Sequence, residues 1–416
     1  MESYQEFEII PTTCVYGGEV LARLPDGRAV FIPYALPDEE IRIRLTEEKE
    51  RYARGEIIEI VKPSPLRIQP RCPHFSECGG CHYQHISYEK QLKIKKAIFV
   101  DQLVRMGKMI DPPVTDIIPS PQAWNYRNQI QLHISREGEP GFLKHRSNQV
   151  VPIQECHLPE DSLNEIWPSL SLEYIPGLDR INLKSGEEGQ DTLVVLESSD
   201  PKPIEFSVDL SLSAVHQGPG GEIVLAGDDF TIIPIQDIPF VVSAGSFFQV
   251  NTGVAELIVD FLLEKLPLQD DTLILDVFCG VGLFSAFLAP EVGKVIGIES
   301  NPKAGEDFLY NLAGIDNVDF YDLPAENVLP FLDITPDIIL LDPPRTGISK
   351  KVLDSVVSLN PELITYISCD PATLARDANR FQKQGYVLEE STLFDMFPQT
   401  FHIESVNIFR RAKKQV

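Results

Sequence analysis

The chain has 416 residues, of which 43% are hydrophobic and 24% are charged, as in an ordinary globular protein. Its net charge of −26 by itself disfavours a nucleic-acid partner, because polyanions repel one another. No apolar run reaches the roughly 20 residues of a membrane helix, and the polar start MESYQEFEII does not resemble a signal peptide. We therefore expect a cytoplasmic protein with no membrane partner, and the sequence indicates no obligate protein partner.

Residues 1–62 alternate short β patterns with turns and contain no helical pattern. The Pro-Asp-Gly at 25–27 is a turn signal between two alternating runs. Several short strands without a helix predict a small β-barrel of the OB type. The proline-rich stretch KPSPLRIQP then indicates a linker.

Residues 63–240 combine one helical pattern, at about 87–107, with strand patterns such as NQIQLHIS and DTLVVLES. This mixture predicts a central α+β domain built on an antiparallel sheet. The segment KQLKIKKAIFVDQLVRMGK (90–108) is basic, and a second basic cluster lies at 144–146. A local basic face can bind RNA even on an acidic protein. We expect Lys93, Lys95 and Lys96 to contribute to such a face.

Four of the seven cysteines form a candidate metal site in this central region. An odd number of cysteines in a chain of this size does not predict a disulfide framework. Four thiolates suit either tetrahedral zinc or an iron–sulfur cluster, and the spacing does not separate the two. Because four cysteines complete a site, we expect the nearby His82 and His85 not to be ligands. The four cysteines are Cys72, Cys78, Cys81 and Cys156.

Residues 241–416 alternate apolar strand patterns with helical patterns. This alternation predicts an α/β domain with a doubly wound, mostly parallel, Rossmann-like sheet. The expected strands are LILDVF, KVIGIES, DIILLDPP, LITYISC and SVNIFRR.

The first of these strands leads into a glycine-containing loop, Asp276-Val-Phe-Cys-Gly280-Val-Gly282. Glycines at this point let the backbone approach a ligand at a helix N-terminus. Ser285 stands where a dinucleotide-binding loop has a third glycine, which disfavours a nicotinamide cofactor. The next strand ends in Glu299, whose carboxylate is placed to accept both ribose hydroxyls of a nucleoside. The pairing resembles a class I S-adenosylmethionine-dependent methyltransferase.

Two further strands end in residues with possible chemistry. Asp342-Pro-Pro-Arg345 resembles the motif of amino-group methyltransferases, although Arg345 replaces their aromatic residue. Cys369 follows the next strand, with Asp370 as a good helix N-cap. The positive end of that helix would favour the thiolate, so Cys369 is either a nucleophile or a structural cysteine.

A thiolate beside a methyl donor indicates a specific reaction. Uracil C5 is a poor nucleophile, but addition of a thiolate to C6 creates an enolate whose C5 attacks the methyl group. A base must then remove the C5 proton before the thiolate leaves. Glu404, in FPQTFHIESV, is the first candidate for this base, and His402, two residues away on the same predicted strand face, is its rival.

The ordered set SFFQVN (246–251), DVFCGVG, DPPR, SCDP and HIES resembles the RNA uracil-5 methyltransferases, whose members act on tRNA or 23S ribosomal RNA. The N-terminal barrel resembles a TRAM domain, and CPHFSECGGCHYQH resembles the iron–sulfur members of that family. The resemblance implies a 4Fe-4S cluster on the four cysteines named above, with zinc as a lesser alternative. It also implies S-adenosylmethionine as cofactor and RNA as partner.

The resemblance implies that Cys369 is the nucleophile and Glu404 the base. The residues that match cofactor-lining positions are Gln249, Phe278, Glu299 and Asp342, beside the loop glycines Gly280 and Gly282. The expected reaction is C5 methylation of a uridine in RNA, with 23S ribosomal RNA favoured over tRNA. An amino-group methyltransferase that uses the DPPR loop, and a non-catalytic metal-bearing RNA-binding protein, are the alternatives.

The sequence departs from the family pattern at two positions. Leu283 follows Gly282 where members commonly carry Asn, and Pro324 stands where many have Asp or Asn. The adenine contacts are therefore assigned either to backbone groups or to the nearby Asp322 or Glu326.

Overall fold

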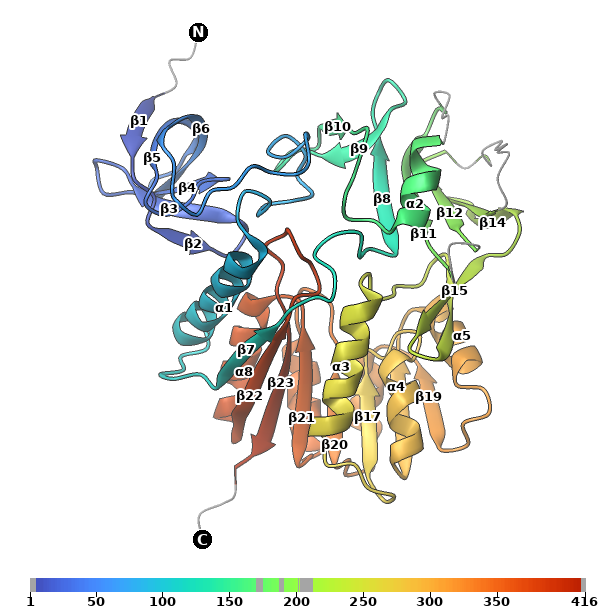
Figure 1. The fold of residues 1–416 in the computed structure, drawn as a ribbon. Helices are drawn as coiled ribbons and strands as arrows, with labels where there is room; N and C mark the ends of the chain where they lie inside the picture. The colour runs from blue at the N-terminus through green and yellow to red at the C-terminus, as the bar shows by residue number, and fades with distance from the viewer. Residues whose placement is uncertain (1–4, 170–174, 187–190, 201, 203–211, 413–416) are drawn as a thin grey trace.

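This computed structural model describes the chain except for residues 1–4, 170–174, 187–190, 201, 203–211 and 413–416 (Figure 1). The described residues form an N-terminal barrel, a central sheet and a C-terminal sheet that is covered by helices on both faces. Among the described residues, no helix is long and apolar enough to cross a membrane.

The N-terminal region is a six-stranded sheet in the order β1-β5-β6-β4-β3-β2. Alternate residues of β5 are buried, which gives the barrel one apolar inner face. Register shifts between β5 and β6 bend this long pair, as β-bulges do in closed sheets. The strands are β1 (Glu6–Ile9), β2 (Thr13–Val15), β3 (Glu19–Arg23), β4 (Ala29–Pro33), β5 (Glu40–Glu48) and β6 (Tyr52–Lys62).

The central sheet has the order β10-β9-β8-β11-β12-β13-β14. It is antiparallel, as expected, except for the parallel pair β12 and β13. Leu163 of the short helix α2 (Asp161–Ile166) packs into its core. The strands are β8 (Gln129–Ile134), β9 (Pro140–Leu143), β10 (Val150–Pro152), β11 (Leu178–Lys184), β12 (Leu193–Ser198), β13 (Ser213–Gly218) and β14 (Gly221–Ala226).

The C-terminal sheet has the order β19-β18-β17-β20-β21-β23-β22-β7. Its five strands β17 to β21 run parallel, and β23 runs antiparallel to β21. Every residue of β20 and β21 is buried, as expected for strands covered on both faces. The strands are β17 (Leu273–Val277), β18 (Lys294–Glu299), β19 (Val318–Asp322), β20 (Ile338–Leu341), β21 (Leu363–Ser368), β22 (Tyr386–Phe394) and β23 (Glu404–Arg411).

Helices cover this sheet, with α3 and α4 in front of it and α8 behind it in the view of Figure 1. Several begin at polar caps that the sequence supplies: Asn251 caps α3, and Asp370 caps α8 by accepting two backbone amide hydrogens. The helices are α3 (Thr252–Lys265), α4 (Leu283–Leu288), α5 (Pro302–Asn311), α6 (Ala325–Val328), α7 (Lys350–Ser358) and α8 (Pro371–Lys383).

The elements do not pack strictly according to the expected domain boundaries at residues 62 and 240. Strand β7 (Val114–Ile118) pairs with β22, and α1 (Tyr88–Arg105) packs against α8, so residues 88–118 extend the C-terminal sheet and its core. The hairpin of β15 (Phe230–Ile235) and β16 (Ile238–Ser243) packs against α3 and α5. Strand pattern alone does not reveal which sheet a short strand joins, because pairing is decided by distant partners.

The loop after β17 needs glycine at Gly282, where φ is +91° and a Cβ would lie 2.3 Å from Leu312 Cδ1. Gly314 has φ of +92° but open space around it. Both alanine substitutions incur about 1–2 kcal/mol of left-handed strain. We expect Gly282→Ala to cost a further ~1–3 kcal/mol for overpacking against α5, measured by urea unfolding. Equal losses for Gly282→Ala and Gly314→Ala would show that α5 yields to the extra methyl group.

Candidate active site and cysteine pocket

A pocket of about 530 Å³ lies at the carboxyl edge of the C-terminal sheet. This edge is where ligands bind in open α/β sheets, and the volume suits a small molecule. The pocket brings together all but one of the residues expected to bind cofactor or to act in catalysis. These lining residues are Gln249, Phe278, Gly280, Glu299, Asp342, Cys369 and Glu404. The exception is Gly282, which packs against α5 instead.

The glycine loop approaches the pocket in an unusual backbone conformation. Phe278 has φ of +67° and Gly280 has φ of +55°. Positive φ in a bulky residue is strained and persists where the surroundings enforce it. Asp276 accepts a hydrogen bond of 2.6 Å from Ser285 Oγ. Ser285 therefore fills the position of the missing third glycine with a side chain that anchors the loop to β17.

Glu299 ends β18 with its carboxylate against the same loop. Its Oε2 accepts a hydrogen bond of 3.1 Å from Gly280 N, and its Oε1 accepts bonds from Ser300 N and Asn301 N at 2.6 and 2.8 Å. The side chain is thus fixed at the rim of the pocket. Its remaining acceptor capacity is available to hydroxyl groups of a ligand.

Acidic groups dominate the electrostatics of the pocket. Burial, together with the charges of Asp276 and Glu299, raises the pKa of Asp342 to about 7. Burial likewise raises the pKa of Asp276 to about 7, although its hydrogen bond from Ser285 opposes the change. A concave site with several carboxylates favours a cationic ligand.

Cys369 and Glu404 lie beside each other at the mouth of β21 and β23. Ser368 pairs with Ser405, so Cys369 and Glu404 are the next residues along the two antiparallel strands. Burial raises the pKa of Glu404 well above its ordinary value, and the charge of Asp342 adds to this. The positive charge of Arg345 opposes it. Glu404 is therefore a strong proton acceptor once it is ionised.

The expectation that the helix end makes Cys369 a thiolate is wrong for the protein without ligand. Burial, together with the charges of Glu404 and Asp342, raises the pKa of its thiol to about 12. Asp370 has already satisfied the amides of Ala372 and Thr373 with Oδ1. The helix end thus faces a carboxylate of its own rather than the sulfur.

His402, the rival base, does not line the pocket. It lies just before β23, and its ring packs against Phe397 and Phe401. Burial, together with the charge of Arg345, lowers the pKa of His402 to about 2. Glu404 is the candidate base on geometry.

Several lining or supporting residues were not anticipated. Phe397 lines the pocket, and the Tyr16 hydroxyl donates a hydrogen bond of 3.0 Å to Asp370 Oδ2 from the N-terminal barrel. Tyr16 could not be found from sequence, because no local pattern links residues so far apart in the chain. Leu283 lines the pocket, whereas Asp322 does not, and Glu326 lines a neighbouring pocket that shares Phe278.

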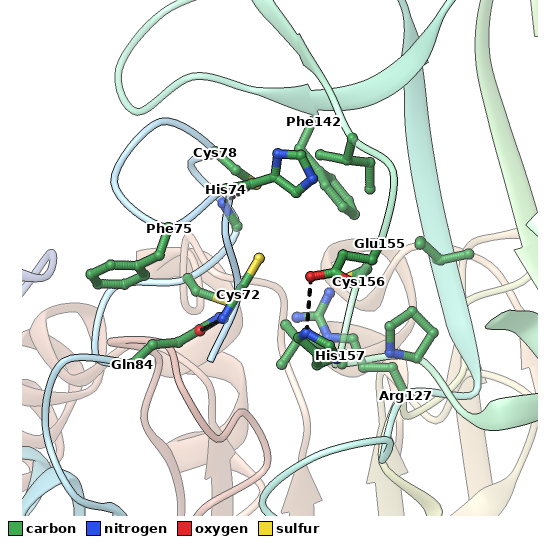
Figure 2. A pocket seen from close by; sticks show the side chains of 16 residues that line it. Cys72, His74, Phe75, Cys78, Gln84, Arg127, Phe142, Glu155, Cys156 and His157 are labelled. Carbon is green, nitrogen blue, oxygen red and sulfur yellow. Dashed lines mark hydrogen bonds and ion pairs between the residues drawn. The ribbon is translucent and has the colours of Figure 1, made fainter. Parts of the chain in front are cut away.

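A second pocket is lined by the four predicted metal ligands, Cys72, Cys78, Cys81 and Cys156 (Figure 2). Burial raises the pKa of Cys156 to about 12 and that of Cys78 to about 11. Gly80 N donates a hydrogen bond of 3.4 Å to Cys78 Sγ, and the guanidinium of Arg127 also faces this pocket. Amide hydrogens and a positive charge near the sulfurs stabilise bound thiolates.

Among the residues that the structure describes, no three Cys, His, Asp or Glu side chains are close enough to hold a single metal ion. The predicted iron–sulfur site therefore stays a prediction. The donor set nevertheless fits a four-iron cluster, in which each cysteine binds a different iron and the sulfurs lie further apart than around one zinc ion. His82 and His85 do not line the pocket.

The expectation that Lys95 contacts RNA is wrong. Its side chain is fully buried, and Nζ lies 2.5 Å from Asp395 Oδ1. Lys93 and Lys96 are accessible but pair with Glu89 and Asp116. The basic composition of α1 therefore overstates the charge that the helix presents to a polyanion.

The fold and the pocket define a class I methyltransferase with an N-terminal barrel. Residues 209–412 match the tRNA (Uracil-5-)-methyltransferase family, and residues 5–58 match the TRAM domain. The chain is 35% identical over 410 residues to the 23S rRNA (uracil(1939)-C(5))-methyltransferase RlmD of Shewanella sediminis, covering 92% of this chain and 91% of that protein. The chain belongs to the family of RNA uracil-5 methyltransferases.

Two further comparisons agree with this assignment. An uncharacterized RNA methyltransferase of Streptomyces avermitilis is 32% identical over 99% of both chains. The crystal structure of Pyrococcus abyssi tRNA (uracil-54, C5)-methyltransferase with S-adenosyl-L-homocysteine has a TM-score of 0.74 at 24% identity. It covers 97% of this chain and 100% of that chain, which shows a shared fold along nearly the whole length.

Because Glu299 lines the pocket beside the glycine loop, we expect it to contribute to cofactor binding. We expect Glu299→Gln to weaken binding of S-adenosyl-L-homocysteine by roughly 10- to 100-fold, because hydrogen bonds to charged groups contribute about 1.5–3 kcal/mol. Calorimetric titration would measure the change. Glu326→Gln, in the neighbouring pocket, is the matched control and should bind as the unaltered protein does. The reverse result would move the nucleoside contact to Glu326.

Proposed function

We propose that this protein methylates C5 of a uridine in 23S ribosomal RNA with S-adenosylmethionine, through a covalent bond from Cys369 to uracil C6. The observation that carries the proposal is the shared pocket, in which Cys369 and Glu404 adjoin the glycine loop and Glu299. The relative from Shewanella sediminis, named for 23S ribosomal RNA, supports this substrate over tRNA. We place the reaction in the cytoplasm, where that RNA is found.

The proposed steps balance in protons and bonds. S-adenosylmethionine supplies an electrophilic methyl group on a positively charged sulfur. The thiolate of Cys369 adds to C6, and the electron pair of the C5–C6 bond becomes an enolate. C5 takes the methyl group and the sulfonium becomes a neutral thioether. Glu404 removes the C5 proton, and the C6–S bond breaks to restore the double bond and the thiolate.

The ionisation of Cys369 requires help in this scheme. Its thiol pKa is raised by burial and by neighbouring carboxylates, so a cation in the pocket would lower it. Arg345 already acts in that direction. The sulfonium adds a second positive charge at the same edge of the sheet. Nucleophile formation would therefore follow cofactor binding.

The other regions would hold and present the RNA. We assign residues 1–62 to a TRAM-like RNA-binding barrel, 63–240 to the central domain and 241–416 to catalysis, with β7 and α1 packed onto the last. The uridine must leave its base stack to reach Cys369. The cysteine pocket would hold a 4Fe-4S cluster on Cys72, Cys78, Cys81 and Cys156, as a structural element away from the reacting atoms.

Fluorinated RNA tests the mechanism and the substrate together. Transcripts of 23S fragments and of tRNA that contain 5-fluorouridine would be incubated with protein and S-adenosylmethionine. Fluorine cannot leave C5 as a proton does, so the covalent protein–RNA adduct should persist on a denaturing gel. We expect an adduct with 23S RNA, none with Cys369→Ala, and an unchanged adduct with Cys14→Ala, a barrel cysteine outside the pocket.

Each other outcome has a defined meaning. An adduct only with tRNA would keep the mechanism and overturn the substrate. No adduct with either RNA, while the cofactor still binds, would favour the amino-group methyltransferase that uses the DPPR loop. Glu404→Gln should instead accumulate adduct on ordinary uridine RNA, since the C5 proton has no acceptor.

The cysteine pocket gives a separate prediction. Protein prepared without oxygen should carry about four iron atoms per chain and a matching amount of acid-labile sulfide. Cys156→Ser should lose most of this iron because it removes one ligand, whereas Cys14→Ser should keep it. Stoichiometric zinc in place of iron, lost in Cys156→Ser, would show that the pocket contracts around a single ion.

A further inference from the structure

The loop of residues 395–403, the β22–β23 loop, controls two side chains of the pocket. It ends immediately before Glu404, the first residue of β23, and it carries Phe397. Glu404 pairs with Phe394 across β22 and β23, and the end of this loop leads directly into it, so both the strand pairing and the loop position its carboxylate. The loop projects from the edge of the sheet towards the central region of the chain (Figure 1).

Gln399 is the point at which the central region holds this loop. Gln399 O accepts hydrogen bonds from His82 N and Tyr83 N, at 2.9 and 3.0 Å. Gln399 makes two hydrogen bonds with the Gln91 side chain: Gln91 Nε2 donates to the side-chain Oε1 of Gln399 at 2.9 Å, and the backbone N of Gln399 donates to Gln91 Oε1 at 3.0 Å. Gln399 Nε2 also donates to Ala123 O.

The backbone of Gln399 has an unusual conformation for a residue other than glycine. Its φ is +68°, a left-handed conformation that glycine adopts without penalty and that costs other residues about 1–2 kcal/mol. The residue is only 2% exposed. The hydrogen bonds of the side-chain amide to Gln91 and Ala123 offset part of the strain. Strain retained in this way is typical of functional positions.

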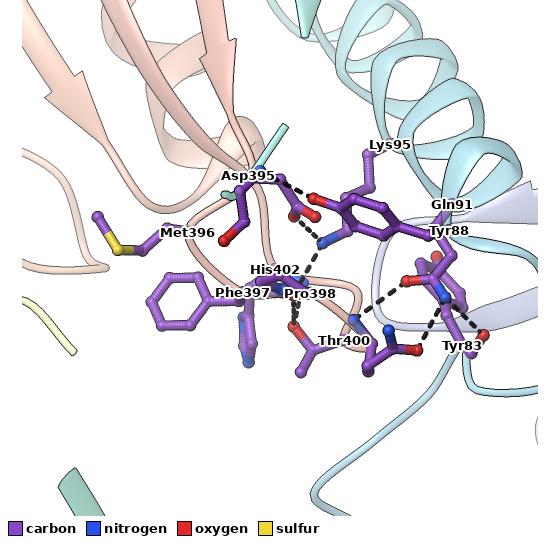
Figure 3. A network of polar contacts seen from close by, with 12 residues as sticks. Tyr83, Tyr88, Gln91, Lys95, Asp395, Met396, Phe397, Pro398, Thr400 and His402 are labelled. Carbon is purple, nitrogen blue, oxygen red and sulfur yellow. Dashed lines mark hydrogen bonds and ion pairs between the residues drawn. The ribbon is translucent and has the colours of Figure 1, made fainter. Parts of the chain in front are cut away.

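Two further residues, Lys95 of α1 and Tyr126 of the central region, hold the same loop (Figure 3). Lys95 Nζ donates to Asp395 Oδ1 at 2.5 Å and to Phe397 O at 2.9 Å. The Tyr126 hydroxyl donates to Pro398 O at 3.0 Å. Gln91 is 1% exposed and Lys95 is fully buried, so these partners are rigid. Gln91 and Lys95, one turn apart on α1, thus both hold the loop.

The nucleophile is held by different elements. Cys369 follows β21, which pairs with β20 on its other side, and Asp370 caps α8. A shift of the β22–β23 loop would therefore displace Glu404 more than it displaces Cys369. Cys369 and Glu404 share the pairing of β21 with β23, but only Glu404 is also joined directly to the β22–β23 loop.

We propose that Gln399, held by Gln91, is a positioning residue that sets Glu404 for removal of the C5 proton. The inference rests on the proposed function and concerns its last chemical step. If the hydrogen bonds between Gln91 and Gln399 are lost, Cys369 still adds to C6 and C5 still takes the methyl group. The C5 proton then leaves slowly, and the C6–S bond persists until it does.

The test uses three variants of the full chain and a chemical readout of that step. Gln399→Gly removes the side-chain amide, and with it the bonds to Gln91 Nε2 and Ala123 O, but keeps the backbone N that donates to Gln91. Because glycine adopts positive φ without penalty, backbone strain cannot explain a defect. Gln91→Met removes the partner with little change in volume. Gln236→Gly is the matched control, because Gln236 also has positive φ, +50°, and hydrogen-bonded amide groups, but lies in the β15–β16 hairpin.

We expect Gln399→Gly and Gln91→Met to accumulate covalent protein–RNA adduct on ordinary uridine RNA, as Glu404→Gln should. Mass spectrometry of the adduct should find the methyl group already on C5. Turnover should fall on the order of 100-fold, the usual effect of misplacing a reacting group by about 1 Å. The initial rate of adduct formation with 5-fluorouridine RNA should stay close to that of the unaltered protein and of Gln236→Gly.

A turnover defect without adduct, or an equal fall in the rate of fluorinated adduct formation, would overturn the inference and leave Gln399 a structural residue. Unchanged turnover in both variants would overturn it as well. Should Gln399→Gly fail to fold by thermal unfolding, Gln91→Met decides the matter. Failure of the proposed function is recognised separately, since the unaltered protein would then form no fluorinated adduct with any RNA.

Discussion

The antiparallel pairing of β23 with β21 is the constraint on which the candidate active site depends. Parallel strands deliver their last residues to one edge, so β17, β18, β20 and β21 present Phe278, Glu299, Asp342 and Cys369 there. Only a strand that runs the other way can begin at that edge. Strand β23 does so, and its first residue, Glu404, therefore lies beside Cys369. Nucleophile and base meet without either being on a long mobile loop.

Burial of these acidic groups links protonation to occupancy of the pocket. Asp276, Asp342 and Glu404 all have raised pKa values, and burial together with the charges of Glu404 and Asp342 raises the pKa of the Cys369 thiol. A cation bound among them would stabilise the ionised forms of all of these groups, because an opposite charge lowers the pKa of an acid. Without a ligand, the proposed nucleophile is thus held in its thiol form. Reactivity is then coupled to the presence of the positively charged methyl donor.

Sequence reasoning found the parts of the structure that local patterns encode. Apolar runs of four to six residues marked β17, β18, β20 and β21, and the motifs at their ends gave nearly all the pocket residues. It failed where distant partners decide the outcome. The placement of β7 beside β22 is fixed by pairing rather than by its own residues, and burial of Lys95 depends on Asp395. The thiolate expected at Cys369 failed because burial and the neighbouring carboxylates of Glu404 and Asp342 raise the pKa of its thiol, while Asp370 itself satisfies the helix end.

The acidity of the chain and an RNA substrate are reconciled by where the basic groups lie, rather than by how many there are. Lys95 is used inside the protein, so α1 offers less charge than its sequence indicates. Beside the candidate active site, the pocket that shares Phe278 is lined by Lys350, Arg376 and Arg380, and Arg345 lines the candidate active site itself. The two arginines Arg376 and Arg380 pair with the buried Asp377, so part of their charge is already neutralised. A phosphate backbone responds to the local potential within about 8 Å at physiological ionic strength, so the charges beside the pocket matter more to it than the net charge of the chain.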